Sequence, residues 1–322
     1  MLKKLKSDKK IVVIGGGTGV FTVLSGLRKH FADLTAIVTM ADDGGSTGVL
    51  REEFGILPPG DVRRALIALS GRDNAMLAKL FNYRFAEGKG LSGHSFGNLM
   101  LAALERLTGS FPRAIEEAGK MLGVAGRVLP VTLTKTRLHA ELEDGRIVDG
   151  EANIDVPLHD GRLRIVRVWL KPTARITAAA RVAIMEADAV LVGPGDLYTS
   201  IIPNILVRGV PEALKQTKAK KMYVVNLMTK HGETNGFAAS DFVCALERYL
   251  GANVLDAVIA NSNVPALSRL KPYVHEGAAL VKIDAVNFPK GLRLTRADLL
   301  RPRGFLRHDS EKLARVVKKL VE

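Results

Sequence analysis

The strongest constraint on the fold is a short apolar segment that ends in a run of glycines. Residues 11–14 are Ile-Val-Val-Ile, and residues 15–19 are Gly-Gly-Gly-Thr-Gly. An unbroken apolar run of this length is typical of a strand buried on both faces. Apolar residues then recur at helical spacing from 20 to 31, and a second apolar run, 34–39, ends in another glycine loop at 41–45. The order strand, glycine loop, helix, strand predicts half of a doubly wound nucleotide-binding fold.

The rest of the chain repeats this rhythm after one interruption. Three more apolar runs lead into loops: 189–192, 222–225 and 257–259. Between 128 and 170 the apolar period changes to two, with Asp-Gly turn signals, which indicates small strands. We therefore predict an α/β protein with a Rossmann-like, mostly parallel sheet in a single domain spanning 1–322. Residues 128–170 form a β-rich insertion within this domain, and residues 1–10 form a basic, flexible leader.

Composition excludes several classes of function. The net charge is +14, but the charge is dispersed and only 5% of residues are aromatic, so a nucleic-acid surface is not predicted. Cys244 is the only cysteine, which excludes an internal disulfide and a thiolate metal cluster. No apolar run reaches the roughly 20 residues that cross a bilayer, and the start does not read as a signal peptide. We expect a cytoplasmic protein without a membrane span.

The first glycine loop is a candidate phosphate site, formed by Gly16, Gly17, Thr18 and Gly19. Residues without a Cβ let backbone amides approach a phosphate, and the helix that follows directs its positive N-terminus toward the anion. The hydroxyl of Thr18 adds a donor. The alternative is a tight turn between strand and helix with no ligand.

The second loop adds acids to the same pattern. Its candidate ligand residues are Asp42, Asp43, Gly44, Gly45, Ser46 and Thr47, with Arg51 one helical turn later. The two acids could hold Mg²⁺ or a ribose, while the hydroxyls and the guanidinium meet phosphate oxygens. The alternative is a capped helix start with a surface pair of acids.

A third loop, formed by Gly193, Pro194, Gly195 and Asp196, follows the strand at 189–192. The carboxyl ends of parallel strands lie at one edge of a sheet, where ligands of open α/β sheets bind. We therefore expect the three loops to converge around one anion, with Asn226 as a further contact after the next strand.

Residues 93–97, Gly-His-Ser-Phe-Gly, match the pattern of a serine-hydrolase elbow. That elbow needs an apolar strand directly before it, and residues 86–92 are a polar loop. We interpret the motif as a helix start, with His94 and Asn98 facing the crevice. His94, His231 and His308 do not have metal-ligand spacing.

With these loops assembled, the chain closely resembles the bacterial gluconeogenesis factors. These are cytoplasmic relatives of the 2-phospho-L-lactate transferases of deazaflavin cofactor synthesis, in the CofD-like superfamily. The resemblance spans nearly the whole chain and is carried by segments in one order: 15–19, 41–48 with Arg51, 59–61 with Arg63, 93–98, 193–200 with 203–204, 226–229 and 307–309.

The resemblance implies a Rossmann-like sheet that binds a nucleotide sugar of the UDP-N-acetylglucosamine type. It also implies a role in cell shape and envelope synthesis during growth on gluconeogenic carbon. In the transferase relatives an acid after the second strand helps to hold a divalent metal, which corresponds to Asp42 and Asp43. The family's late motifs make Tyr273 a candidate stacking partner for the base and Arg307 a candidate phosphate contact.

The chain departs from the family pattern at two places. Asp196 stands where the family usually has Ser, which puts a negative charge beside the expected phosphate. Lys230 and His231 stand where Gln-Pro is common, so the partner surface there is expected to differ.

Three hypotheses about function follow. The first is a nucleotide-sugar-binding regulator of envelope metabolism, a homodimer with a protein partner. The second is a metal-dependent phospho-ester transferase like the relatives, in which Asp42 and Asp43 are the only obvious catalytic acids. The third is an NAD-dependent oxidoreductase, which is weaker because Val20 stands where the third glycine of the dinucleotide fingerprint belongs.

Overall fold

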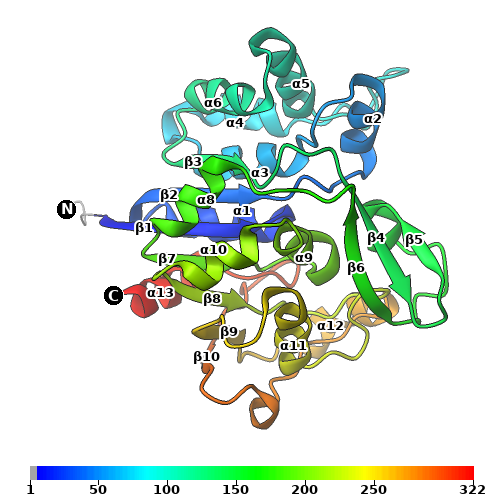
Figure 1. Ribbon diagram of the computed structural model, residues 1–322, viewed down its shortest axis with the longest axis vertical. Helices are drawn as coiled ribbons and strands as arrows, with labels where there is room; N and C mark the ends of the chain where they lie inside the picture. The colour runs from blue at the N-terminus through cyan, green and yellow to red at the C-terminus, as the bar shows by residue number, and fades with distance from the viewer. Residues whose placement is uncertain (1–5) are drawn as a thin grey trace.

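The computed structural model describes residues 6–322, and its main element is a seven-stranded sheet. The strand order is β10-β9-β8-β7-β1-β2-β3, and every neighbouring pair is parallel (Figure 1). The strands are β1 (Ser7–Gly15), β2 (Phe31–Val38), β3 (Arg127–Pro130), β7 (Ala189–Val192), β8 (Lys220–Val224), β9 (Ala257–Asn261) and β10 (Arg293–Ala297). The predicted Rossmann-like sheet is thereby confirmed.

Helices flank this sheet in two groups. On one side α1 packs against α3 and α13, and α8 packs against α10 in the other group. The helices are α1 (Gly17–Leu27), α2 (Gly45–Phe54), α3 (Gly60–Leu69), α4 (Ala75–Asn82), α5 (Phe96–Thr108), α6 (Phe111–Met121), α7 (Glu151–Asp155), α8 (Ala178–Met185), α9 (Ile202–Ile205), α10 (Val210–Gln216), α11 (Ala239–Leu250), α12 (Leu267–His275) and α13 (Ser310–Val321). No helix in residues 6–322 is long and apolar enough to cross a membrane.

The central strands are buried because helices cover both faces. Residues 11–14 of β1 are at most 2% exposed, and all four residues of β7 are fully buried. Val, Ile and Leu suit this position because branched side chains pack well on a pleated surface.

A second, smaller sheet lies beside the carboxyl ends of the main strands (Figure 1). It is antiparallel, with the order β5-β4-β6, and its strands are β4 (Arg137–Leu142), β5 (Ile147–Asp149) and β6 (Ile165–Lys171). Buried side chains of both sheets belong to one hydrophobic cluster. The expected start of the insertion at 128 is wrong, because β3 pairs with β2 in the main sheet. As an edge strand, β3 alternates between buried and less buried residues, which gives its sequence the period of two that is typical of the insertion.

The predicted basic, flexible leader is wrong for residues 7–10. β1 already begins at Ser7, and Lys10 is paired with Asp33 of β2. The ammonium of Lys9 lies 2.9 Å from a carboxylate oxygen of Asp188. Residues 7–10 are therefore an ordered, exposed end of the central strand. Residues 1–5 of the expected leader lie outside the described residues.

Candidate functional site

The chain order of the sheet reverses between β1 and β7, which is where open α/β sheets bind their ligands. The first glycine loop follows β1 and the third follows β7. The two loops are in direct backbone contact: a Cβ placed on Gly19 would lie 1.9 Å from the carbonyl oxygen of Pro194. Only glycine fits here, so the sequence of the first loop allows this close approach.

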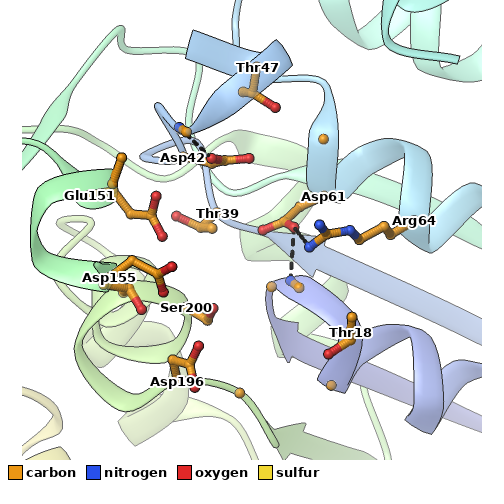
Figure 2. A pocket seen from close by; sticks show the side chains of 18 of the residues that line it. Thr18, Thr39, Asp42, Thr47, Asp61, Arg64, Glu151, Asp155, Asp196 and Ser200 are labelled. Carbon is orange, nitrogen blue, oxygen red and sulfur yellow. Dashed lines mark hydrogen bonds and ion pairs between the residues drawn. The ribbon is translucent and has the colours of Figure 1, made fainter. Parts of the chain in front are cut away.

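A pocket of about 870 Å³ opens at this point (Figure 2). The three predicted loops converge on it, together with α7 of the insertion and the C-terminal segment before α13. Most of the residues predicted for the site line this pocket: Gly16, Gly17, Thr18, Gly19, Asp42, Gly44, Gly45, Ser46, Thr47, Asn98, Pro194, Gly195, Asp196, Asn226, Tyr273 and Arg307. Asp43, Arg51, His94 and Gly193 are not among the lining residues.

The two adjacent acids of the second loop point in different directions. The Oδ1 atom of Asp42 accepts a hydrogen bond from the Gly44 amide at 3.0 Å, and its side chain borders the pocket. The Oδ1 atom of Asp43 instead accepts from the amide of Ala152 at 2.8 Å, in the first turn of α7. Asp42 is therefore placed to contact a ligand or a metal, whereas Asp43 fixes α7 against the main sheet.

Arg51 does not line the pocket and instead stabilises the second loop. Its guanidinium donates hydrogen bonds to the carbonyl oxygens of Ala41, Asp42 and Thr136. These bonds join the second loop to the segment that leads into the insertion. They give Arg51 a structural role in place of the expected phosphate contact.

The motif at 93–97 starts a helix, as the sequence indicates. Ser95 is fully buried and caps α5 by accepting a hydrogen bond from the Asn98 amide. His94 is buried behind the pocket wall, and its Nδ1 lies 3.0 Å from Oγ of Ser46. A buried capping serine without a strand before it is not a hydrolase nucleophile.

Arg63, in α3, is the buried cation of the pocket. Its side chain lines the pocket and the residue is only 4% exposed. The guanidinium donates to two neutral amides, to Asn98 Oδ1 at 3.0 Å and to Asn82 Oδ1 at 2.9 Å. No salt bridge among the described residues includes Arg63, and burial lowers its pKa to about 10. A buried charge without an ion-pair partner favours an anionic ligand.

Carboxylates occupy another part of the wall (Figure 2). Asp61, in the first turn of α3, accepts from the Gly17 amide at 2.8 Å and so holds the first glycine loop in place. Burial, reinforced by the nearby charge of Asp42, raises the pKa of Asp61 to about 6. Glu151 of α7 lies across the pocket, and burial together with the charges of Asp42 and Asp155 raises its pKa to about 9. Burial also raises the pKa of Asp42.

The donor set for a metal can be read from these positions. Asp42 lines the pocket together with the first residues of α1 and α2, and Mg²⁺ is commonly bound by one or two carboxylates plus substrate phosphates. Asp43 does not fit, since its carboxylate is turned to α7. Among the described residues, Asp155, Asp196 and Glu233 form an acidic group whose possible ligand atoms lie within 4.8 Å of one another. The ammonium of Lys230 lies among them.

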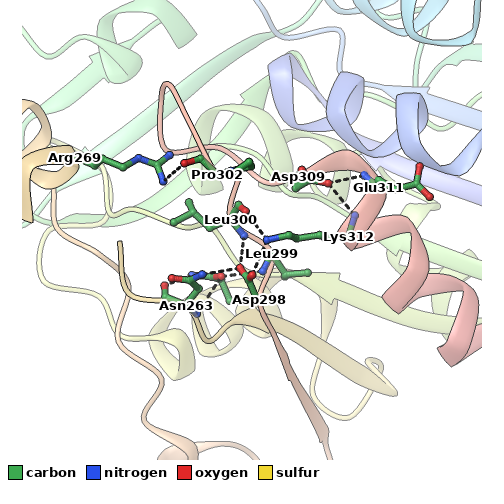
Figure 3. A network of polar contacts seen from close by, with 10 residues as sticks. Asn263, Arg269, Asp298, Leu299, Leu300, Pro302, Asp309, Glu311 and Lys312 are labelled. Atoms are coloured by element: carbon green, nitrogen blue, oxygen red, sulfur yellow. Dashed lines mark hydrogen bonds and ion pairs between the residues drawn. The ribbon is translucent and has the colours of Figure 1, made fainter. Parts of the chain in front are cut away.

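The C-terminal side of the pocket is formed by the loop between β10 and α13, and hydrogen bonds of Lys312 hold this loop in place (Figure 3). Lys312 donates to Asp298 at 2.5 Å and to the carbonyl of Leu300 at 3.0 Å. Arg307, in the same loop, lines the pocket. The hydroxyl of Tyr273 accepts from the amide of Leu306 at 2.8 Å, which connects α12 to the loop.

Sequence reasoning missed several residues of this pocket. Asp61 and Arg63 had a signal, because they belong to the segment 59–63 of the family pattern, but no ligand role was assigned to them. Glu151 and Asp155 had none: they lie in a five-residue helix inside the insertion, and only the tertiary structure brings them to the main sheet.

Comparisons with known proteins agree on the family. Residues 11–300 match a family model described as 2-phospho-L-lactate transferase CofD. A gluconeogenesis factor of Halalkalibacterium halodurans is 45% identical over 277 residues, which cover 86% of this chain and 84% of the relative. The gluconeogenesis factor of Bacillus subtilis is 42% identical over 317 residues, covering 97% of this chain and 98% of the relative.

The fold agrees as well. A crystal structure of a Bacillus halodurans protein superposes with a TM-score of 0.92 at 41% identity, covering 97% of this chain and all of that one. Sequence identity, matched length and fold lead to one conclusion. The chain belongs to the CofD family, among the gluconeogenesis factors.

Proposed function

We propose that this chain is a cytoplasmic protein that binds a nucleotide sugar of the UDP-N-acetylglucosamine type and regulates envelope metabolism and cell shape. The observation that carries the proposal is Arg63, a buried guanidinium that lines the pocket and is bonded only to neutral amides. A diphosphate would give this guanidinium a direct ion-pair partner.

The helix starts support the same ligand. The first amides of a helix have no partner within it, and residues at the starts of both α1 and α2 line the pocket. Together with the positive ends of the two helices, these amides favour an anion. The Gly17 amide is bound to Asp61, the Gly44 amide to Asp42 and the Thr47 amide to the Gly44 carbonyl, so only part of the two helix starts is available to a ligand.

The size and the acids of the pocket favour more than a bare phosphate. A volume of about 870 Å³ lies in the upper part of the range for small-molecule sites. A carboxylate accepts hydrogen bonds and a protonated carboxyl can also donate one, so Asp42, Glu151 and Asp196 are suited to the hydroxyls of a sugar. Of the two acids in the second loop, Asp42 is the one that could share a Mg²⁺ with the diphosphate. The cation would offset the negative charges of the Asp42 carboxylate and of the diphosphate.

A second candidate is a phospho-ester transferase, and Glu151 favours it. A carboxyl with a pKa of about 9 still carries its proton at neutral pH, and can give it to a leaving oxygen. In this alternative Glu151 and Asp42 act on a substrate held by Arg63. The transferase predicts turnover of the bound ligand, whereas the regulator predicts binding alone.

Titration calorimetry tests the proposal. UDP-N-acetylglucosamine, UDP, N-acetylglucosamine 1-phosphate and NAD⁺ are titrated with and without Mg²⁺ into the full chain. The proposal expects saturable binding of the nucleotide sugar that is tighter than binding of UDP. Absence of heat for the nucleotide sugar under both conditions overturns it, and product formation in the same mixtures selects the transferase. Light scattering of the protein checks the expected homodimer.

A further inference from the structure

Lys230 lies in the loop after β8, where its ammonium contacts three carboxylates. Its Nζ atom is 2.9 Å from Asp196 Oδ2 and 3.1 Å from Glu233 Oε1, and it is also paired with Asp155. The three acids come from three parts of the chain: α7 of the insertion, the third glycine loop, and the segment before α11. We call these four residues the Lys230 cluster.

Glu233 connects the cluster to the glycine loop. Its side chain is fully buried, and its two carboxylate oxygens accept from the amide of Tyr198 and the hydroxyl of Thr199, each at 3.0 Å. These residues lie in the π-helical segment Leu197–Ile201, which directly follows the third loop. The position of the loop therefore depends on Glu233, which in turn is held by Lys230.

Asp155 connects the cluster to the insertion. It ends α7, the helix whose first residue is Glu151. Asp155, Asp196 and Glu151 all line the pocket (Figure 2). At its other end α7 is held by the bond between Asp43 and the Ala152 amide. The Lys230 cluster is thus the polar contact that joins the C-terminal end of α7 to the third glycine loop.

The charge balance of the cluster favours a cation. Without the ammonium, three carboxylates would lie within 4.8 Å of one another in a partly buried place, and like charges at this distance repel strongly. The same three oxygens have the spacing of a divalent-metal site. Here Lys230 supplies the positive charge from within the chain.

We infer that Lys230 is a positioning residue of the nucleotide-sugar pocket, and that its ammonium takes the place of a bound cation between α7 and the third glycine loop. The inference rests on the proposed function for its effect on ligand affinity. Its prediction about cations does not depend on any nucleotide.

The experiment compares Lys230→Met with Lys230→Arg, Lys221→Met and the double variant Asp196→Ser/Lys230→Met. Lys221 is a matched control, because its largely buried ammonium pairs with Asp256 at 3.2 Å and it is not a pocket-lining residue. Binding of UDP-N-acetylglucosamine is measured by calorimetry at pH 8 in EDTA. The melting temperature of each ligand-free protein is measured in EDTA and in Ca²⁺.

Lys230→Met is expected to weaken binding by about 10-fold or more, and Lys230→Arg is expected to restore much of it. Lys221→Met is expected to lower the melting temperature without changing the affinity. Ca²⁺ is expected to raise the melting temperature of Lys230→Met, but not that of the wild type or of the double variant, which lacks one ligand.

Unchanged affinity in Lys230→Met overturns the positioning role, and so does an affinity loss of equal size in Lys221→Met. Failure of Ca²⁺ to stabilise Lys230→Met overturns the exchange of ammonium for metal. If the wild type binds no nucleotide sugar either in EDTA or with Mg²⁺, the proposed function fails, and the Ca²⁺ measurement alone then decides whether Lys230 replaces a cation.

Discussion

The backbone of Gly19 in α1 lies directly against the carbonyl oxygen of Pro194, so that the loops after β1 and β7 share one contact at the reversal of the sheet. Because a Cβ on Gly19 would lie only 1.9 Å from that oxygen, the overlap involves main chain on both sides and no rotamer change relieves it. Gly19→Ala is therefore expected to lower the free energy of unfolding by about 3 kcal/mol or more.

Guanidinium denaturation measures this change, with Gly119→Ala as the control. Gly119 lies within α6, and the nearest atom to its added Cβ is 3.7 Å away. That variant is expected to be neutral or to stabilise the protein by about 0.5–1 kcal/mol. Equal stability of Gly19→Ala and the wild type would show that the two loops are not in contact.

Asp42 and Asp43 are expected to behave differently although they are neighbours. Asp42→Asn removes a negative charge that faces the ligand, so the gain in affinity for UDP-N-acetylglucosamine on adding Mg²⁺ should disappear. In EDTA the same variant should bind as tightly as the wild type or more tightly, since less charge repels the diphosphate. Asp43→Asn keeps an oxygen for the Ala152 amide and should retain the Mg²⁺ effect. Calorimetry with and without Mg²⁺ checks both, and an equal loss in the two variants would contradict this assignment.

Arg63 is expected to contribute more to binding than Arg51. Removing a buried charge that faces an anion typically costs about 2 kcal/mol or more, so Arg63→Met should weaken nucleotide-sugar binding by roughly 30-fold. Arg51→Met loses hydrogen bonds to three carbonyl oxygens and should destabilise the protein with little change in affinity. Calorimetry and thermal melting of both variants separate the two effects. A larger affinity loss in Arg51→Met would reverse these roles.

The strands that sequence reasoning could identify are the ones covered on both faces. Residues 11–14 of β1, all of β7 and residues 257–260 of β9 read as unbroken apolar runs because these side chains are buried. The edge strand β10, with the sequence Arg-Leu-Thr-Arg-Ala, has no fully buried residue, and its pattern resembles a loop. The other edge strand, β3, was assigned to the insertion for a related reason.

The glycine loops could be located because each follows a predictable strand, and parallel strands end at one edge. The pocket wall formed by α7 could not be predicted, because the direction of a side chain on α7 depends on how the insertion packs against the main sheet. The two departures from the family pattern show the same limit. Asp196 and Lys230, 34 positions apart, form one ion pair, and this explains why a negative charge is tolerated beside the glycine loop.

Glu151 leads to a pH-dependent prediction. Its pKa is about 9 in the folded protein, against 4.5 for an ordinary Glu, because burial and the charges of Asp42 and Asp155 disfavour the carboxylate. Below about pH 4.5 the folded and unfolded states both hold the proton. Between pH 4.5 and 9 the folded state keeps a proton that the unfolded state has lost, so the free energy of unfolding falls as the pH rises.

Glu151→Gln removes this titration. The difference in free energy of unfolding between Glu151→Gln and the wild type should be small near pH 4.5. Toward pH 9 it should increase in favour of the variant, by on the order of 1–3 kcal/mol at pH 8. Guanidinium denaturation at pH 5, 6.5 and 8 measures the trend in ligand-free protein. Glu52→Gln is the control, because the Glu52 side chain is 71% exposed and its removal should shift stability equally at each pH. If the profile of Glu151→Gln ran parallel to that of the wild type, Glu151 would already be ionised at neutral pH. It could then accept sugar hydroxyls but could not serve as the proton donor that the transferase alternative requires.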